Sequence, residues 1–151
     1  MKKLIAIIVI VMCAMVSVFA RPSARYETGG EQPVRFVPLG ICMDTGGRAL
    51  AAFQFELKAL SGDVEIVGVE GGMHRAYNEP PYYDPAALAN DRIIIAAFNT
   101  GSDLPTGHTR VATLHLRIAG NVEPEYELKL IVAADAEGSE IPAEITFAEG
   151  E

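Results

Sequence analysis

The sequence predicts an all-β protein that folds as an antiparallel β-sandwich. Apolar and polar residues alternate along several segments of strand length, which is the pattern of a strand with one buried face and one wet face. Turn residues separate these segments at short intervals, and no long helical pattern lies between them, so a parallel α/β sheet is excluded. The chain has 151 residues, of which 50% are hydrophobic and 21% are charged. This length and composition are typical of one globular domain.

Residues 1–20 have the features of a secretory signal peptide. Lys2 and Lys3 form a basic start, and Leu4–Ala20 is apolar except for Ser17. Val18–Ala20 has the small first and third residues that signal peptidase accepts. We therefore expect cleavage after Ala20 and a secreted protein, extracellular or periplasmic. The alternative is an uncleaved membrane anchor, because an apolar stretch of this length nearly spans a bilayer core.

Cleavage would change the charge and the cysteine count. The chain has 12 basic and 20 acidic residues, a net charge of -8, and the loss of Lys2 and Lys3 would make it -10. A chain this acidic disfavours nucleic acid and anionic lipid as partners. Cys42 would be the only remaining thiol, which excludes an intramolecular disulfide. Its apolar neighbours predict a buried and inert thiol.

The mature chain is expected to begin with a flexible arm, residues 21–32, followed by a single domain, residues 33–148. The first strand is predicted over Pro33–Met43. Its apolar positions change parity at Val37–Pro38, which indicates a bulge or an edge position, because proline cannot donate to a strand ladder. The expected inward residues are Val34, Phe36, Val37, Leu39 and Ile41.

Six further segments are predicted to be strands. Leu50–Leu60 alternates most regularly, and Arg92–Asn99 is a continuous apolar run, which predicts a central strand covered on both faces. Pro142 marks the last strand as an edge. With the first strand this makes seven, for which a closed barrel is the alternative to a sandwich. The remaining predicted strands are Val64–Glu70, Thr109–Ile118 (Ala112, Leu114, Leu116 and Ile118 inward; Thr113, His115 and Arg117 outward), Tyr126–Val132 (Tyr126, Leu128, Leu130 and Val132 inward) and Ile141–Phe147.

The segment Met73–Asp91 interrupts this pattern. Asp84–Asn90 is predicted to form one or two helical turns, with Asp84 as N-cap and Pro85 in the first position. The candidate binding residues of the chain lie in the same segment: His74, Tyr77, Tyr82 and Tyr83. Tyrosines on a loop can stack on a sugar ring or anchor a protein partner. The alternative is that these rings close the open end of the sandwich and seal its core.

Four segments together resemble cohesin-type domains. They are Leu50–Leu57, Val64–Gly72, Asp91–Phe98 and Arg110–Ile118, and the resemblance extends from Val34 to Phe147. It implies a nine-stranded jelly-roll sandwich related in fold to carbohydrate-binding modules. It also implies a protein partner of the dockerin type, a small calcium-loop module. The Tyr-Asp-Pro motif that cohesins carry after the first long strand is found here only later, at Tyr83–Pro85.

No motif of the sequence predicts catalysis, a metal or another cofactor. His108 and His115 lack a zinc-ligand spacing, and the chain has no Gly-x-Ser-x-Gly and no phosphate loop. Asp44, Asp103 and Asp135 sit in glycine-containing turns without a calcium-loop spacing. We therefore expect a non-catalytic binding or scaffolding module that presents a sandwich surface to another protein. The first alternative is a carbohydrate-binding module that stacks a polysaccharide on loop tyrosines, and the second is a small hydrolase.

Overall fold

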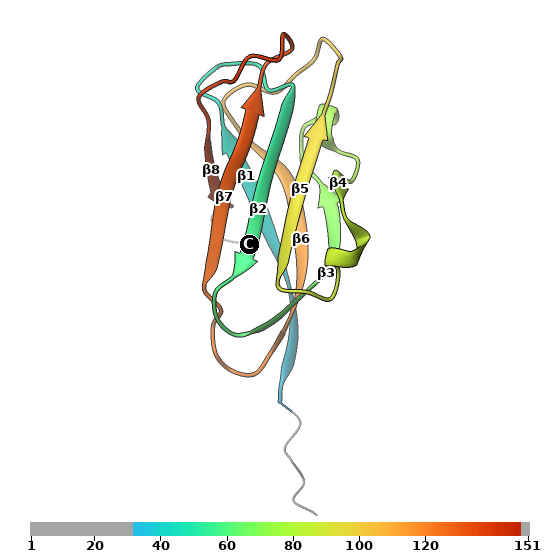
Figure 1. Ribbon diagram of the computed structural model, residues 1–151, viewed down its shortest axis with the longest axis vertical. Coiled ribbons are helices and arrows are strands. Elements are labelled where there is room, and N and C mark those ends of the chain that lie inside the picture. Colours follow the sequence, from blue (N-terminus) through green and yellow to red (C-terminus); the bar gives the residue numbers. More distant parts are fainter. Residues whose placement is uncertain (1–31, 149–151) are drawn as a thin grey trace, which may run out of the picture. The chain divides into compact units, whose positions relative to one another are not determined.

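The computed structural model describes residues 32–148. The predicted signal peptide and nearly all of the predicted arm therefore lie outside the described residues. The chain divides into two units, Met1–Glu31 and Gln32–Glu151, and the second contains every described residue. It holds eight strands in two antiparallel sheets of four strands each (Figure 1). The predicted all-β sandwich is confirmed, with eight described strands rather than the nine that the resemblance implies, whereas its jelly-roll connectivity stays a prediction.

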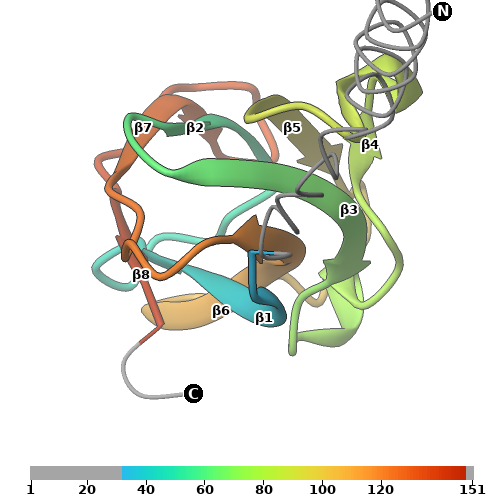
Figure 2. The same ribbon diagram turned by 90° about the horizontal axis from the view of Figure 1, so that it is seen from below.

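The two sheets have different strand orders. Sheet A runs β3-β6-β1-β8 and sheet B runs β4-β5-β2-β7. Figure 2 looks along the strands and shows β7, β2 and β5 in one layer and β8, β1 and β6 in the other. No helix among residues 32–148 is long and apolar enough to cross a membrane. The elements are β1 (Val34–Asp44), β2 (Ala52–Ala59), β3 (Asp63–Gly71), η1 (Arg75–Tyr77), β4 (Tyr82–Tyr83), η2 (Pro85–Ala87), β5 (Arg92–Phe98), β6 (His108–Ala119), β7 (Tyr126–Ala134) and β8 (Glu144–Phe147), where η denotes a 3-10 helix.

The core lies between the sheets and is built from alternate residues of the long strands. Phe53 and Phe55 of β2 stack with their ring centroids 6.1 Å apart. The predicted inward row of β6 is confirmed, because Ala112, Leu114, Leu116 and Ile118 are all buried. Burying this apolar surface is the main favourable contribution to folding.

The predicted change of parity in β1 is wrong. Val37 and Leu39 pack against the core, whereas Val34 and Phe36 point outward, and Phe36 is 68% exposed. The predicted edge position holds for part of the strand only. β1 lies between β6 and β8, but β8 pairs with Ile41–Asp44, so among the described strands the half of β1 that contains Pro38 pairs with β6 alone. The pairing of β1 with β6 shifts between Ile41 and Cys42 instead.

Three other predicted orientations also differ in the structure. Ile93 and Ile95 of β5 are buried, but Ile94 and Phe98 are exposed, so β5 is covered on one face only. In β7 a register shift at Ile131 turns Val132 outward and places Ala133 in the core. Thr113, which was expected to face outward in solvent, is buried.

The capped turn predicted at Asp84 is present but shorter than expected. Asp84 Oδ1 accepts a hydrogen bond from Ala86 N at 2.9 Å, and Pro85 begins the 3-10 helix η2. Sequence reasoning did not predict η1 or the two-residue strand β4, which pairs Tyr82 with Ala96 and Tyr83 with Ile95. β4 adds the two tyrosines to the edge of sheet B.

Candidate binding surface

Tyr77 is a core residue. Its side chain is 5% exposed, its ring packs edge-on against Phe53 with centroids 5.0 Å apart, and its hydroxyl donates a hydrogen bond to Leu50 O at 2.9 Å. Burial raises the pKa of this hydroxyl to about 12. Tyr77 therefore seals the interior, as the alternative interpretation of the insert predicted.

We expect Tyr77→Phe to lower the free energy of unfolding by about 1–2 kcal/mol at pH 8, because Leu50 O loses its buried donor. The folded-state pKa lies above that of an unfolded tyrosine, about 10. The wild-type advantage is thus complete below pH 10 and declines as the pH rises through 12. Urea unfolding of both proteins at pH 8, 10 and 11.5 measures the difference. A difference that stays constant over this range would contradict the assignment.

His74 lies beside η1 in a loop cluster. Its Nδ1 accepts a hydrogen bond from Ala76 N at 3.2 Å, which caps the 3-10 helix. Its Nε2 is 3.8 Å from Asp103 Oδ2, and Arg75 Nε donates to the same carboxylate oxygen. These contacts hold two loops together, and they account for the position of His74 without a ligand.

The two adjacent tyrosines of β4 have different surroundings. Tyr83 is half-buried and packs against the core. Tyr82 is 68% exposed and stacks on Phe98, which is 64% exposed, with centroids 5.9 Å apart and the rings within 10° of parallel. Of the four candidate residues, Tyr82 is the one whose ring lies mostly in solvent.

Tyr82 belongs to a larger apolar surface on the outer face of sheet B. Register places Tyr82, Ala96, Gln54 and Val132 in one row across four strands. Figure 1 looks onto this face, and no other described segment crosses it. We call its large exposed side chains, each 40–68% exposed, the apolar band: Tyr82, Ile94, Phe98, Ile131 and Val132.

The other half of this face is charged. Arg92 Nε and Nη2 donate to Glu56 Oε1 and Oε2 at 2.8 and 3.0 Å, and these hydrogen bonds lower the pKa of the Glu56 carboxyl. Lys58 lies between Arg92 and Glu127, and Lys129 lies opposite Glu56. Opposite charges thus alternate beside the apolar band and leave little net charge on this half.

A pocket of about 520 Å³ opens where β4 and η2 meet β5. We call it the Tyr82 pocket. The aromatic wall is Tyr82, and Asp84 and Arg92 supply its charged groups. Its full lining is Tyr82, Tyr83, Asp84, Ala87, Arg92, Ile93, Ile94 and Ala96. This volume lies within the range of small-molecule sites.

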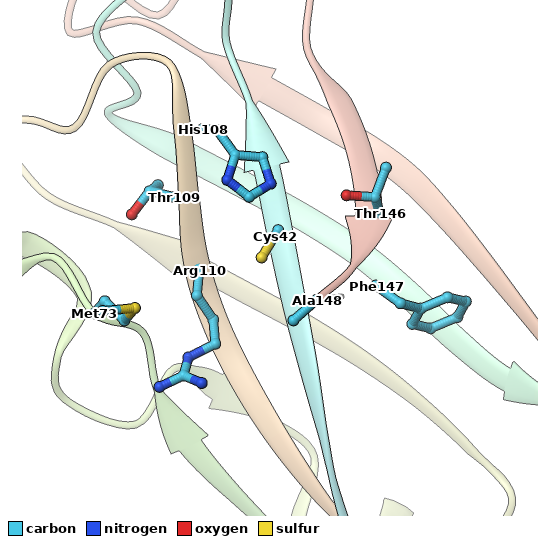
Figure 3. Close-up of a pocket in the computed structure, with 8 residues that line it drawn as sticks. All are labelled: Cys42, Met73, His108, Thr109, Arg110, Thr146, Phe147 and Ala148. Carbon is cyan, nitrogen blue, oxygen red and sulfur yellow. The ribbon is translucent and has the colours of Figure 1, made fainter. Parts of the chain in front are cut away.

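A larger cavity of about 760 Å³ lies on the opposite side, over sheet A (Figure 3). Cys42 of β1, Arg110 of β6 and Thr146 of β8 share one outward row there, and His108 lies at the rim. Cys42 is 4% exposed, so the predicted burial of the thiol is confirmed. Among the described residues, no group of three His, Cys, Asp or Glu side chains could hold a metal ion.

No protein-family model, curated protein or solved structure matches this chain. Its function is therefore inferred from the geometry of the two outer faces.

Sequence reasoning found Tyr82 but missed most of its neighbours. Phe98 and Ile94 belong to an apolar run that predicts burial on both faces, and alternation predicts that Val132 faces inward, yet all three side chains are exposed. Arg92 carried no motif, because its partner Glu56 is 36 residues away in the chain. The one available signal was the length of the apolar run before Asn99, which provides more apolar residues than one buried face needs.

Proposed function

We propose that the chain is a non-catalytic binding module that docks another protein on the apolar band of sheet B. The observation that supports this proposal is the exposure of five large apolar side chains on one sheet face that no described segment crosses. Contiguous exposed apolar surface with a polar rim marks interaction sites, because leaving it in water is unfavourable. The long strands β2, β5 and β7 hold these side chains on a rigid support, which limits the entropy lost on binding.

The composition of the face favours a protein as its occupant. Its aromatic and aliphatic groups lie around Gln54, and charged groups of opposite sign lie beside one another on the other half of the face. Such a mixture of apolar and polar groups is usual in a protein interface. After the expected cleavage each copy of this chain would carry a net charge of -10, and this repulsion disfavours self-association, which supports a different protein as the partner. The cohesin resemblance makes a dockerin-like module the expected class, and the signal peptide would place the encounter outside the cytoplasm.

The test compares two surfaces of the same protein. The immobilised protein is used to capture its partner from the culture medium of its source, and the Kd of the purified partner is then measured by calorimetry. We expect the double variant Phe98→Ser, Val132→Ser to weaken binding at least ten-fold, because interface energy concentrates in a few central side chains.

Phe36→Ser is the matched control. Phe36 is as exposed as Tyr82 but lies on β1 of sheet A, so its replacement should leave the Kd within two-fold of the wild-type value. The proposal is rejected if no protein is retained, if Phe36→Ser weakens binding as much as the double variant, or if neither variant weakens it.

A further inference from the structure

We infer that the Tyr82 pocket, which shares Tyr82 and Ile94 with the apolar band, binds a neutral sugar residue of a glycan. This goes beyond the protein docking proposed for the apolar band. The inference rests on three features of the pocket: an aromatic ring with one face available, a hydrogen-bond acceptor, and a hydrogen-bond donor whose charge is already neutralised.

Tyr82, the aromatic wall of the pocket, is held in place by its neighbour Phe98. Phe98 stacks on one face of Tyr82 with the rings nearly parallel. The pocket lies on the other side, toward Ile94 and Arg92, and Phe98 does not line it. Phe98 covers one face of the Tyr82 ring, so the second face is the one available to a ligand in the pocket. The electron-rich face of a tyrosine ring attracts the weakly positive C–H groups on the flat side of a pyranose.

Asp84 provides the acceptor. Its Oδ1 is held by Ala86 N at 2.9 Å, which orients the carboxylate at the start of η2. A carboxylate has about four lone-pair positions, so this one capping bond leaves capacity to accept from sugar hydroxyls.

Arg92 provides the donor. Two of its N–H groups pair with Glu56, at 2.8 and 3.0 Å, and this pair fixes the guanidinium beside the pocket. A guanidinium has five N–H donors, so three lie outside the pair. Glu56 also balances the positive charge, which removes the main attraction for an anionic ligand.

Together these groups match a neutral polyol better than an ion. Each sugar hydroxyl both donates and accepts, and the pocket offers an acceptor and a donor beside a stacking surface. An anion would be repelled by the carboxylate of Asp84, and a cation would face the N–H groups of Arg92, which donate hydrogen bonds and cannot coordinate it. The volume of about 520 Å³ leaves room for more than one sugar ring, and the open face of sheet B allows a glycan chain to continue past the pocket.

The site can be tested by NMR on the isotope-labelled protein, titrated with neutral hexasaccharides of glucose, xylose and mannose up to 10 mM. We expect saturable shifts of the amides around Tyr82, Asp84 and Ile94 with at least one sugar. Tyr82→Ala should weaken this binding at least ten-fold, and Asp84→Asn, which keeps the capping oxygen, should weaken it several-fold.

Two controls separate this site from the rest of the surface. Asp44→Asn removes a charge from a matching turn, in which Asp44 Oδ1 accepts from Gly46 N at 2.9 Å, and it should leave sugar binding unchanged. Val132→Ser removes part of the apolar band but no pocket residue, and it should also have no effect. The inference fails if no neutral sugar gives saturable shifts, if Tyr82→Ala leaves them unchanged, or if only charged oligosaccharides bind. Such a failure leaves protein docking intact, because the docking test uses Phe98 and Val132.

Discussion

Gly72→Ala is expected to lower the free energy of unfolding by about 3 kcal/mol or more, because the added methyl group has no room. A Cβ at Gly72 would overlap the carbonyl oxygen of Arg110 and lie 2.7 Å from Val111 Cα. Both are backbone atoms of β6, so no side-chain rotation relieves the overlap. The chain here is also held by Gly72 N donating to Tyr77 O at 2.6 Å and Met73 N donating to Arg110 O at 2.9 Å. Urea unfolding followed by circular dichroism measures the loss.

Gly46→Ala is the informative comparison for this prediction. Gly46 has φ +58°, but nothing lies within 4 Å of its added Cβ. The substitution therefore introduces only the strain of a left-handed alanine, roughly 1 kcal/mol. Gly72 does not have a positive φ, so Gly72→Ala introduces the steric overlap without left-handed backbone strain. Equal losses for the two variants would show that the segment after β3 can move away from β6.

The sequence predicted the strands well because their signals are local. Alternation along β2 and β6 follows from the two-residue period of a strand and needs no knowledge of distant residues. The capped turn at Asp84 is equally local, since the side chain bonds to a backbone group two residues further on. Glycines and prolines marked the turns and edges for the same reason.

Local sequence signals do not predict that the side chains of the apolar band face solvent. A continuous apolar run such as β5 does not reveal whether its second face is covered, because the cover comes from the assembly of the sheets. Val132 faces outward because the pairing of β7 with β2 shifts its register. The sequence of β7 contains no signal that predicts this shift. Tyr77 and Tyr82 share a segment, and nothing in their local sequence distinguishes them, yet η1 places Tyr77 in the core and β4 places Tyr82 in solvent.

Phe53→Ala is expected to lower the free energy of unfolding by about 3–5 kcal/mol, since it leaves a cavity in the core. Phe53 is 2% exposed and contacts the rings of Phe55 and Tyr77. A domain of this size is stable by about 5–15 kcal/mol, so this loss is a large fraction of the total. Thermal and urea unfolding of the purified variant measure it, and a loss below about 1 kcal/mol would contradict the assigned core.

Phe98→Ala is the matched control, because it removes the same ring from the opposite face of sheet B. Phe53 pairs with Ala97, so Phe98 is the next residue along the neighbouring strand and points outward. Its replacement should change the free energy of unfolding by no more than about 0.5 kcal/mol. A loss comparable to that of Phe53→Ala would mean that Phe98 stabilises the fold. If stability is instead unchanged, the exposed ring has no structural role to explain it, and docking of a partner becomes the stronger explanation for its presence on this face.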